Sequence, residues 1–203
     1  MVPHRRPTPN GYTAPARTPD MSDTSDWRER LVENRAEKDR FLAEHPQSPI
    51  PPEQRDGFDG LAYYDPDPDY RVQAAVEVHD DPEPAYMETT TGGEMRYLRA
   101  VTLRFDLDGT EHTLAGYRQP GEGHLFVPFR DKTTGQQTYS AGRYMELELD
   151  GEPSELPERV TLDFNLAYNP FCAYSETFDC PLPPEENWLE AAVEAGERDE
   201  PAQ

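Results

Sequence analysis

The chain has 203 residues, enough for one domain with tails, and 34% of them are hydrophobic, which is low for a globular protein. Acidic residues number 41 and basic residues 19, so the net charge is −22, and Lys38 and Lys132 are the only lysines. Such a surface excludes binding to nucleic-acid backbones, and because no apolar run approaches the roughly 20 residues of a membrane span, we expect no membrane contact.

The charge pattern predicts a halophilic, cytoplasmic protein. In molar salt the Debye length is about 3 Å, so the repulsion between carboxylates is screened. An acidic disordered protein or a nucleic-acid mimic would carry a similar charge. However, 10% aromatic residues and clear strand periodicity argue against disorder.

Residues 1–25 are predicted to form a disordered tail. The first twenty residues contain five prolines, and three arginines against one aspartate give them a charge of +2. Arg5-Arg6 fits a twin-arginine export signal, but no apolar segment follows it, so we reject that interpretation. Met21 is a natural alternative start. A single domain is expected over residues 26–197, with a frayed tail at residues 198–203.

A first helix is predicted from about residue 26 to residue 45. Asp26 follows Ser25 as a suitable N-terminal cap, and Pro46 ends the helix. The residues at helical spacing are Trp27, Leu31, Asn34, Lys38 and Phe41. Because this apolar stripe is thin, we expect the helix to lie on the outside of a sheet.

After the helix, the sequence alternates with the period of two residues that strands require. We expect short strands in FDGLAYY and YRVQAAVEVH, separated by DPDPD and ended by DDPEP, and a long strand over residues 94–107. Asp108-Gly109 then predicts a two-residue hairpin turn that pairs Phe105 with His112. His112 therefore lies on the apolar face, where we favour a packing role over a ligand role.

A second hairpin is predicted between HLFVPFRD and TYSAGRYMELELD, with Gly135 in a loop of three to five residues. Aligning the two apolar faces pairs Phe129 with Tyr139 and Leu125 with Arg143. Arg143 then lies inside the sheet. Because burying an unpaired guanidinium costs several kcal/mol, Arg143 needs an anion.

The next strand, RVTLDFNLAY, places Asp163 and Asn165 on one face. If this strand is central in a curled sheet, Asp163 is the expected partner of Arg143; if it lies at an edge, Asp163 faces water.

The segment CPLPPEENWLEAAVEAGE is predicted to form a C-terminal helix, with Pro184 in its first turn and Gly196 at its end. The expected fold is therefore α+β: a curled antiparallel sheet or partly open β-barrel with an N-terminal and a C-terminal α-helix.

Several long motifs resemble those of a known family. FVPFRDKTTGQQTYSAGRY, LDFNLAYNPFCAYSETFDCPLPPEENWL and the final AGE, together with NRAEKDRFL, SPIP and FDGLAYY, resemble the domain of unknown function 1684 (DUF1684), in a haloarchaeal-type member. The likeness covers roughly residues 26–197. The family occurs in bacteria and archaea and has no established activity, so the resemblance implies no catalytic residue and identifies no cofactor.

The two cysteines, Cys172 and Cys180, are separated by seven residues. Structural zinc sites favour pairs two to four apart and need two further ligands, so no metal site is expected. The acidic neighbours Glu176 and Asp179 argue against a nucleophilic thiol. A disulfide closing the loop is geometrically feasible, but a reducing cytosol opposes it, and we favour two buried free thiols.

A polar group is predicted around Arg143 and Asp163, with Tyr139, Asn165 and Asn169 beside them. The favoured function is a pocket that binds a small polar or anionic ligand through Arg143.

Two other functions are open. One is a small hydrolase or isomerase in which Asp163 acts with His124 or Tyr168. The other is a non-enzymatic structural or interaction domain, in which a sealed Arg–Asp network only stabilises the fold. The sequence leaves the oligomeric state undecided.

Overall fold

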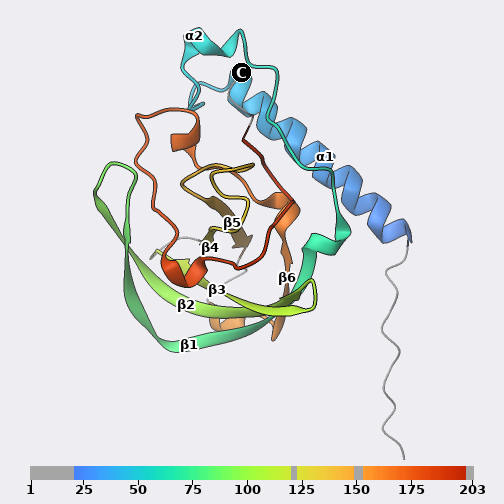
Figure 1. Ribbon diagram of the computed structural model, residues 1–203, viewed down its shortest axis with the longest axis vertical. Coiled ribbons are helices and arrows are strands. Elements are labelled where there is room, and N and C mark those ends of the chain that lie inside the picture. Colours follow the sequence, from blue (N-terminus) through green and yellow to red (C-terminus); the bar gives the residue numbers. More distant parts are fainter. Residues whose placement is uncertain (1–20, 120–122, 149–152, 200–203) are drawn as a thin grey trace, which may run out of the picture.

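The computed structural model describes residues 21–119, 123–148 and 153–199, which form a six-stranded antiparallel sheet that curls into a nearly closed barrel (Figure 1). The strand order is β5-β4-β3-β2-β1-β6. The strands are β1 (Arg71–Glu88), β2 (Glu94–Leu107), β3 (Thr110–Arg118), β4 (His124–Phe129), β5 (Arg143–Glu148) and β6 (Arg159–Asp163). The predicted curled sheet is confirmed.

The chain beyond β6 returns to the other edge of the sheet. Tyr144 in β5 and Tyr168 exchange backbone hydrogen bonds of 2.9 and 3.0 Å. This bridge joins the two edges, so fewer backbone groups are left open to pairing with another chain.

The first hairpin forms as predicted. Phe105 pairs with His112, and the turn residues Asp108 and Gly109 have φ values of 53° and 73°. Positive φ at both positions matches the right-handed twist of the strands. The half-buried ring of His112 lies 5.9 Å from that of Phe105, which confirms the packing role.

Two strand predictions before this hairpin need correction. β1 continues through DDPEP and only shifts register between Val78 and Glu83, because a bulge absorbs the extra residues. Residues 58–64 form no strand; their pairing is the isolated bridge between Tyr63 and Glu197.

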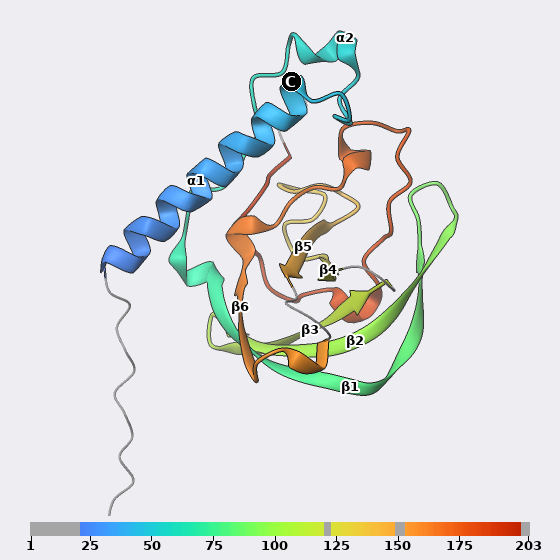
Figure 2. The ribbon, with the colours of Figure 1, turned by 180° about the vertical axis from the view of Figure 1, so that it is seen from behind.

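The N-terminal helix lies on the outside of the barrel, as predicted, and both views of the ribbon show this (Figures 1 and 2). It is α1 (Met21–Glu44), and its side chains Trp27, Leu31 and Leu42 are buried. The helix begins at Met21, before the predicted start, so residues 21–25 belong to the helix and not to the tail. The rest of the predicted tail, residues 1–20, lies outside the described residues.

The remaining helices are short. They are α2 (Pro52–Arg55) and the 3-10 turns η1 (Pro68–Tyr70), η2 (Pro153–Glu155), η3 (Phe164–Leu166), η4 (Phe171–Ala173) and η5 (Glu185–Asn187). None of the helices in the described ranges has the length and apolarity to cross a membrane.

The connection between β4 and β5 is longer than predicted. Phe129 pairs with Arg143 and not with Tyr139, so the predicted register is wrong by four residues. The intervening chain folds onto Asp131, whose carboxylate accepts hydrogen bonds from the hydroxyls of Thr133 and Thr134 at 2.8 and 3.1 Å. An aspartate that binds nearby groups in this way builds a compact loop in place of a simple hairpin turn.

The predicted C-terminal helix does not form within the described residues. After η5 the chain runs irregularly, and it pairs with the β4–β5 connection. Leu189 N donates to Arg130 O at 2.8 Å, and Lys132 N donates to Ala191 O at 2.9 Å. Backbone groups that a helix would pair internally are thus satisfied by another segment, so tertiary contacts override the local helix preference. Arg198 and Asp199, which were predicted to lie in a frayed tail, are bonded to the rest of the fold: Arg198 N donates to Ala62 O at 2.9 Å and Asp199 N donates to Gln137 O at 3.0 Å. The rest of that predicted tail, residues 200–203, lies outside the described residues.

Asn187 links β3 and β4 where they diverge. The two strands share only the pair Tyr117–Phe126. The fully buried amide of Asn187 donates to Ala115 O at 2.9 Å and to Pro128 O at 2.7 Å, and it accepts from Ala115 N at 2.7 Å. A side-chain amide, which has both donors and acceptors, replaces the missing strand pairing.

Apolar side chains occupy both faces of the sheet, since alternate residues of a strand point to opposite sides. The larger cluster includes Leu103, Phe105, Leu114, Leu125, Val127, Phe129, Leu162 and Phe164. The smaller cluster on the other face contains Met87, Tyr97, Ala115, Tyr117, Phe126 and Tyr144.

Candidate functional site

Arg143 is buried inside the barrel, as predicted, but its partner is not Asp163. Its side chain is fully enclosed, and one Nη lies 3.5 Å from Asp131 Oδ1. The Nη atoms also donate to Val193 O at 2.8 Å, to Glu197 O at 3.2 Å and to Ala195 O. The predicted Arg143–Asp163 pair is therefore corrected to Arg143–Asp131.

Asp131 holds this network together from the other side. Its Oδ2 accepts a hydrogen bond of 2.6 Å from Val193 N, and the side chain has no exposed surface. Burial lowers the pKa of Arg143 from its ordinary value, and the Asp131 carboxylate opposes this effect. The Arg143 Nη groups bind the protein itself, so the sealed network expected as a structural alternative is present, with Asp131 as the acid.

Asp163 lies at the end of β6, where it meets α1. Its carboxylate accepts hydrogen bonds from Trp27 Nε1 at 2.7 Å and from Asn165 N and Nδ2 at 3.1 and 2.9 Å. Arg71 Nε lies 3.1 Å from Asp163 Oδ2. Asp163 thus caps η3 through Asn165 N and holds α1 against the end of β6 through Trp27.

The acid–base pairs predicted for an enzyme are not assembled. Tyr168 donates its hydroxyl proton to Glu146 Oε1 at 2.6 Å, and His124 lies opposite Glu148 in β5. No hydrogen bond or ion pair of the described chain joins Asp163 to either group. The geometry therefore gives no support to proton transfer between them.

An open hollow lies at the seam between α1 and the barrel, and we call it the seam hollow. Its volume is about 280 Å³. Its walls come from one side of α1 and from the chain around η3. The lining residues are Asn34, Arg35, Lys38, Phe41, Tyr63, Asn165, Leu166, Ala167, Tyr168, Phe171 and Glu197. Two of the predicted residues, Asn165 and Tyr168, are among them.

Lys38 and Glu197 form an ion pair at the seam hollow. The Glu197 side chain is 1% exposed, and its Oε2 accepts hydrogen bonds of 2.7 Å from both Asn169 N and Tyr174 OH. Lys38 Nζ lies 4.7 Å from the centre of the Tyr168 ring. Burial raises the pKa of Tyr168 and of Tyr174, so both hydroxyls stay protonated.

Two buried donors of the seam hollow lack an acceptor in the described structure: Tyr63 OH and Arg35 Nε. The Arg35 guanidinium lies 4.4 Å from the centre of the Tyr63 ring, and its Nη1 donates to Tyr64 O at 2.9 Å. Burial raises the pKa of Tyr63, so its hydroxyl keeps its proton. Unpaired buried donors are uncommon in native proteins and call for an explanation.

A second hollow of about 350 Å³ continues along α1 and shares Asn34 and Leu166 with the seam hollow. Arg30, Arg71 and Asp163 also line it. A third and larger hollow, about 700 Å³, is lined only by α1 among the described residues, so nothing described forms its opposite wall.

No pattern in the sequence singled out three residues that line the seam hollow: Arg35, Tyr63 and Glu197. One signal was available for Lys38, which interrupts the apolar stripe of α1 and is one of only two lysines. Two predicted residues do not line the seam hollow. Asn169 N donates to Glu197 Oε2 at 2.7 Å, and Tyr139 lies elsewhere, with its hydroxyl 3.3 Å from Cys172 O.

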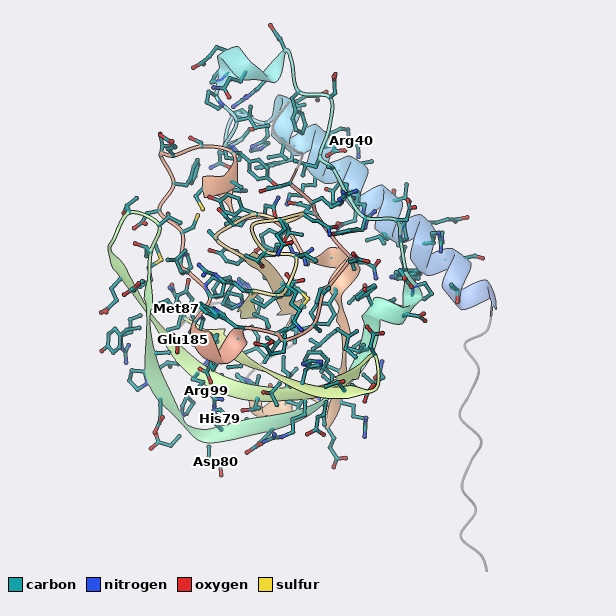
Figure 3. All side chains as sticks on the ribbon, in the orientation of Figure 1. Arg40, His79, Asp80, Met87, Arg99 and Glu185 are labelled. Carbon is teal, nitrogen blue, oxygen red and sulfur yellow. The ribbon has the colours of Figure 1, made fainter. Side chains whose placement is uncertain are left out.

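A separate polar cluster lies on β1 and β2, where Figure 3 shows His79 beside Arg99. Arg99 Nε lies 2.9 Å from Glu186 Oε2, and Tyr117 donates to Glu186 Oε1 at 2.5 Å. These groups satisfy one another, which fits a structural network. Among the described residues, no three His, Cys, Asp or Glu side chains gather as metal ligands would.

The family described as "Protein of unknown function (DUF1684)" matches residues 56–198. The solution NMR structure of an uncharacterized protein from Haloarcula marismortui is 62% identical to this chain, covers 88% of it and 97% of its own length, and superposes with a TM-score of 0.69. No curated protein matches.

Proposed function

Because the chain belongs to the DUF1684 family, whose function is unknown, we propose a function from geometry: the protein binds a small anionic ligand, a carboxylate or a phosphate ester, in the seam hollow. The predicted small polar or anionic ligand is narrowed to an anion, and its proposed place moves from the sealed Arg143 to the seam hollow. The acidic composition supports a salt-rich cytoplasm as the place of action.

The observation that carries this proposal is the pair of unpaired donors, Tyr63 OH and Arg35 Nε. A buried donor without an acceptor costs about 1–3 kcal/mol, and a ligand oxygen that reached either donor from the seam hollow would remove that cost. An acceptor-rich group such as a carboxylate or a phosphate fits donors better than a second donor would.

Charge and size support the same class of ligand. Arg35 and Lys38 against Glu197 leave the seam hollow with a net charge of +1, on a chain whose net charge is −22. Its volume of about 280 Å³ is close to the lower end of the roughly 300–1,000 Å³ of small-molecule pockets. Tyr63, Tyr168 and Phe171 offer aromatic walls, so the rest of the ligand can be apolar or planar.

The test is a thermal-shift screen of small carboxylic acids and phosphate monoesters in molar KCl, followed by calorimetric titration of each hit. Tyr63→Phe removes only the unpaired hydroxyl. We expect it to leave the unfolding temperature unchanged or slightly higher and to weaken binding roughly 10- to 100-fold, as the loss of one hydrogen bond to a charged group predicts.

Tyr86→Phe is the matched control, because Tyr86 is 59% exposed and lies away from the seam hollow. It should bind every hit as the unaltered protein does. If no anion binds, or if Tyr63→Phe binds as tightly as the control, the proposal fails.

A further inference from the structure

Cys172 and Cys180 lie on one loop, which adjoins the seam hollow at Phe171. We propose that they form a reversible dithiol–disulfide site that a hydroperoxide oxidises, with Cys172 as the attacking thiol and Cys180 as the resolving thiol. Both thiols are free in this structure, Cys172 half-buried and Cys180 buried. This inference does not depend on the proposed ligand.

The two cysteines are held in place by residues from other elements. Cys180 N donates to Thr90 Oγ1 at 3.1 Å, and Thr90 N donates to Cys180 O at 3.0 Å. On the other side, Tyr139 OH lies 3.7 Å from Cys172 Sγ and 3.3 Å from Cys172 O.

The loop between the cysteines is closed by its own side chains. The rings of Phe171 and Phe178 meet edge to face, with their centres 5.3 Å apart. This contact folds the loop back on itself before any bond forms. A disulfide needs the two α-carbons roughly 4.4–6.8 Å apart, and a loop that is already folded loses less chain freedom when the bond forms.

The hydrogen bonds make the two sulfurs unequal. The pKa of Cys172 falls to about 6, because its thiolate accepts hydrogen bonds from Cys180, Tyr139 and Thr90. The same interaction raises the pKa of the Cys180 thiol, which remains protonated as the donor. The half-buried sulfur is therefore the nucleophile, contrary to the expectation from its acidic neighbours in sequence. Because Cys172 is only partly exposed, a small oxidant reaches it more readily than a bulky organic disulfide.

The reaction balances as follows. The Cys172 thiolate attacks one oxygen of the peroxide, the O–O bond breaks, and the leaving hydroxide takes a proton to become water. Cys180 then attacks the sulfenic sulfur of Cys172, forming the S–S bond and expelling the second oxygen as water with the Cys180 proton. The two thiols lose two electrons and the peroxide gains two; a dithiol reductant reverses the change.

The first experiment treats the full chain in molar KCl with one equivalent of hydrogen peroxide and then alkylates the remaining thiols. Peptide mass mapping should find an intramolecular Cys172–Cys180 disulfide that a dithiol reductant removes. Oxidised protein with only intermolecular disulfides, or with both thiols still free to alkylate, would overturn the proposal.

The second experiment separates the roles of the two cysteines. In Cys180→Ser, peroxide should leave a sulfenic acid on Cys172 that dimedone traps, while Cys172→Ser should form no such adduct on Cys180.

A third measurement uses the unaltered protein, so it does not depend on the folding of a variant. At pH 6 a thiol with a pKa of about 6 is half ionised, whereas an ordinary thiol with a pKa of about 8.5 is roughly 0.3% ionised. After allowance for the weaker nucleophilicity of the less basic thiolate, Cys172 should react with iodoacetamide on the order of tenfold faster than an ordinary thiol. Equal labelling of Cys172 and Cys180 would contradict the assigned roles.

Discussion

The buried ion pair between Asp131 and Arg143 provides a stability prediction that the structure makes quantitative. In Asp131→Asn the Arg143 guanidinium keeps its three carbonyl acceptors but loses the carboxylate that lies 3.5 Å away. Breaking a fully buried pair by removing one partner leaves an uncompensated charge, which costs about 3–5 kcal/mol. For a protein of this size, each kcal/mol lowers the unfolding temperature by roughly 2–4 °C, so we expect a fall of about 6–20 °C.

The assay is urea unfolding at constant molar KCl, with calorimetric melting as a second probe. Glu77→Gln is the matched control, because Glu77 also pairs with an arginine, Arg104, at 3.0 Å, but with side chains 60% and 50% exposed. An exposed pair contributes about 0–1 kcal/mol and is sensitive to salt, whereas the buried pair should show the same loss at any salt that keeps the protein folded. A loss below about 1 kcal/mol for Asp131→Asn would refute the view that this pair holds the C-terminal segment in place.

Three further outcomes are expected. Gly196→Ala should destabilise the fold by about 1–3 kcal/mol more than Gly109→Ala. Both glycines have positive φ (80° and 73°), but only at Gly196 does an added Cβ meet backbone, 2.5 Å from Ala167 O. Equal losses in urea unfolding would contradict the steric argument. Burial raises the pKa of several tyrosines, which include Tyr117, Tyr144 and Tyr174. Above about pH 10 the unfolded chain loses phenol protons that the native state keeps, so each of these tyrosines lowers the free energy of unfolding by about 1.4 kcal/mol per pH unit. Guanidinium titrations from pH 9 to 11 should show this loss, and a flat profile would contradict it. Dialysis from molar KCl to about 0.1 M lengthens the Debye length from about 3 to about 10 Å and should unfold a chain of charge −22, and a circular dichroism spectrum unchanged by dialysis would disprove the halophilic prediction.

The sequence predicted those elements whose geometry is decided by nearby residues. Asp108-Gly109 favours one turn conformation, so the register from Phe105 to His112 follows directly. The stripe from Trp27 to Phe41 likewise predicts a helix that covers a sheet from outside.

The elements that failed depend on partners distant in sequence. The segment after η5 has helix-forming composition, but its backbone groups hydrogen-bond to Arg130, Lys132 and Arg143. These residues lie 50 to 59 positions earlier in the chain. The β4–β5 register failed because Asp131 folds the connection around itself, which the apolar pattern does not encode.

The candidate site was only partly predictable for the same reason. Strand alternation predicts that Arg143 faces inward. Its acidic partner is Asp131 and not Asp163 because the connection between β4 and β5 folds back onto the barrel, which strand alternation does not indicate. The seam hollow forms where α1 crosses the chain near η3, and no local pattern in the sequence indicates that crossing.

The ion pair between Lys38 and Glu197 has a consequence for biosynthesis. It ties the first helix to the last part of the described chain, and the acceptors of Arg143 come from the same late segment. A ribosome delivers these residues after every strand of the sheet, so the nascent polypeptide cannot complete its interior until this late segment has emerged. Until then the apolar faces of its strands stay exposed to solvent. Such exposure is typical of topologies rich in long-range contacts, and chaperones protect growing chains in this state.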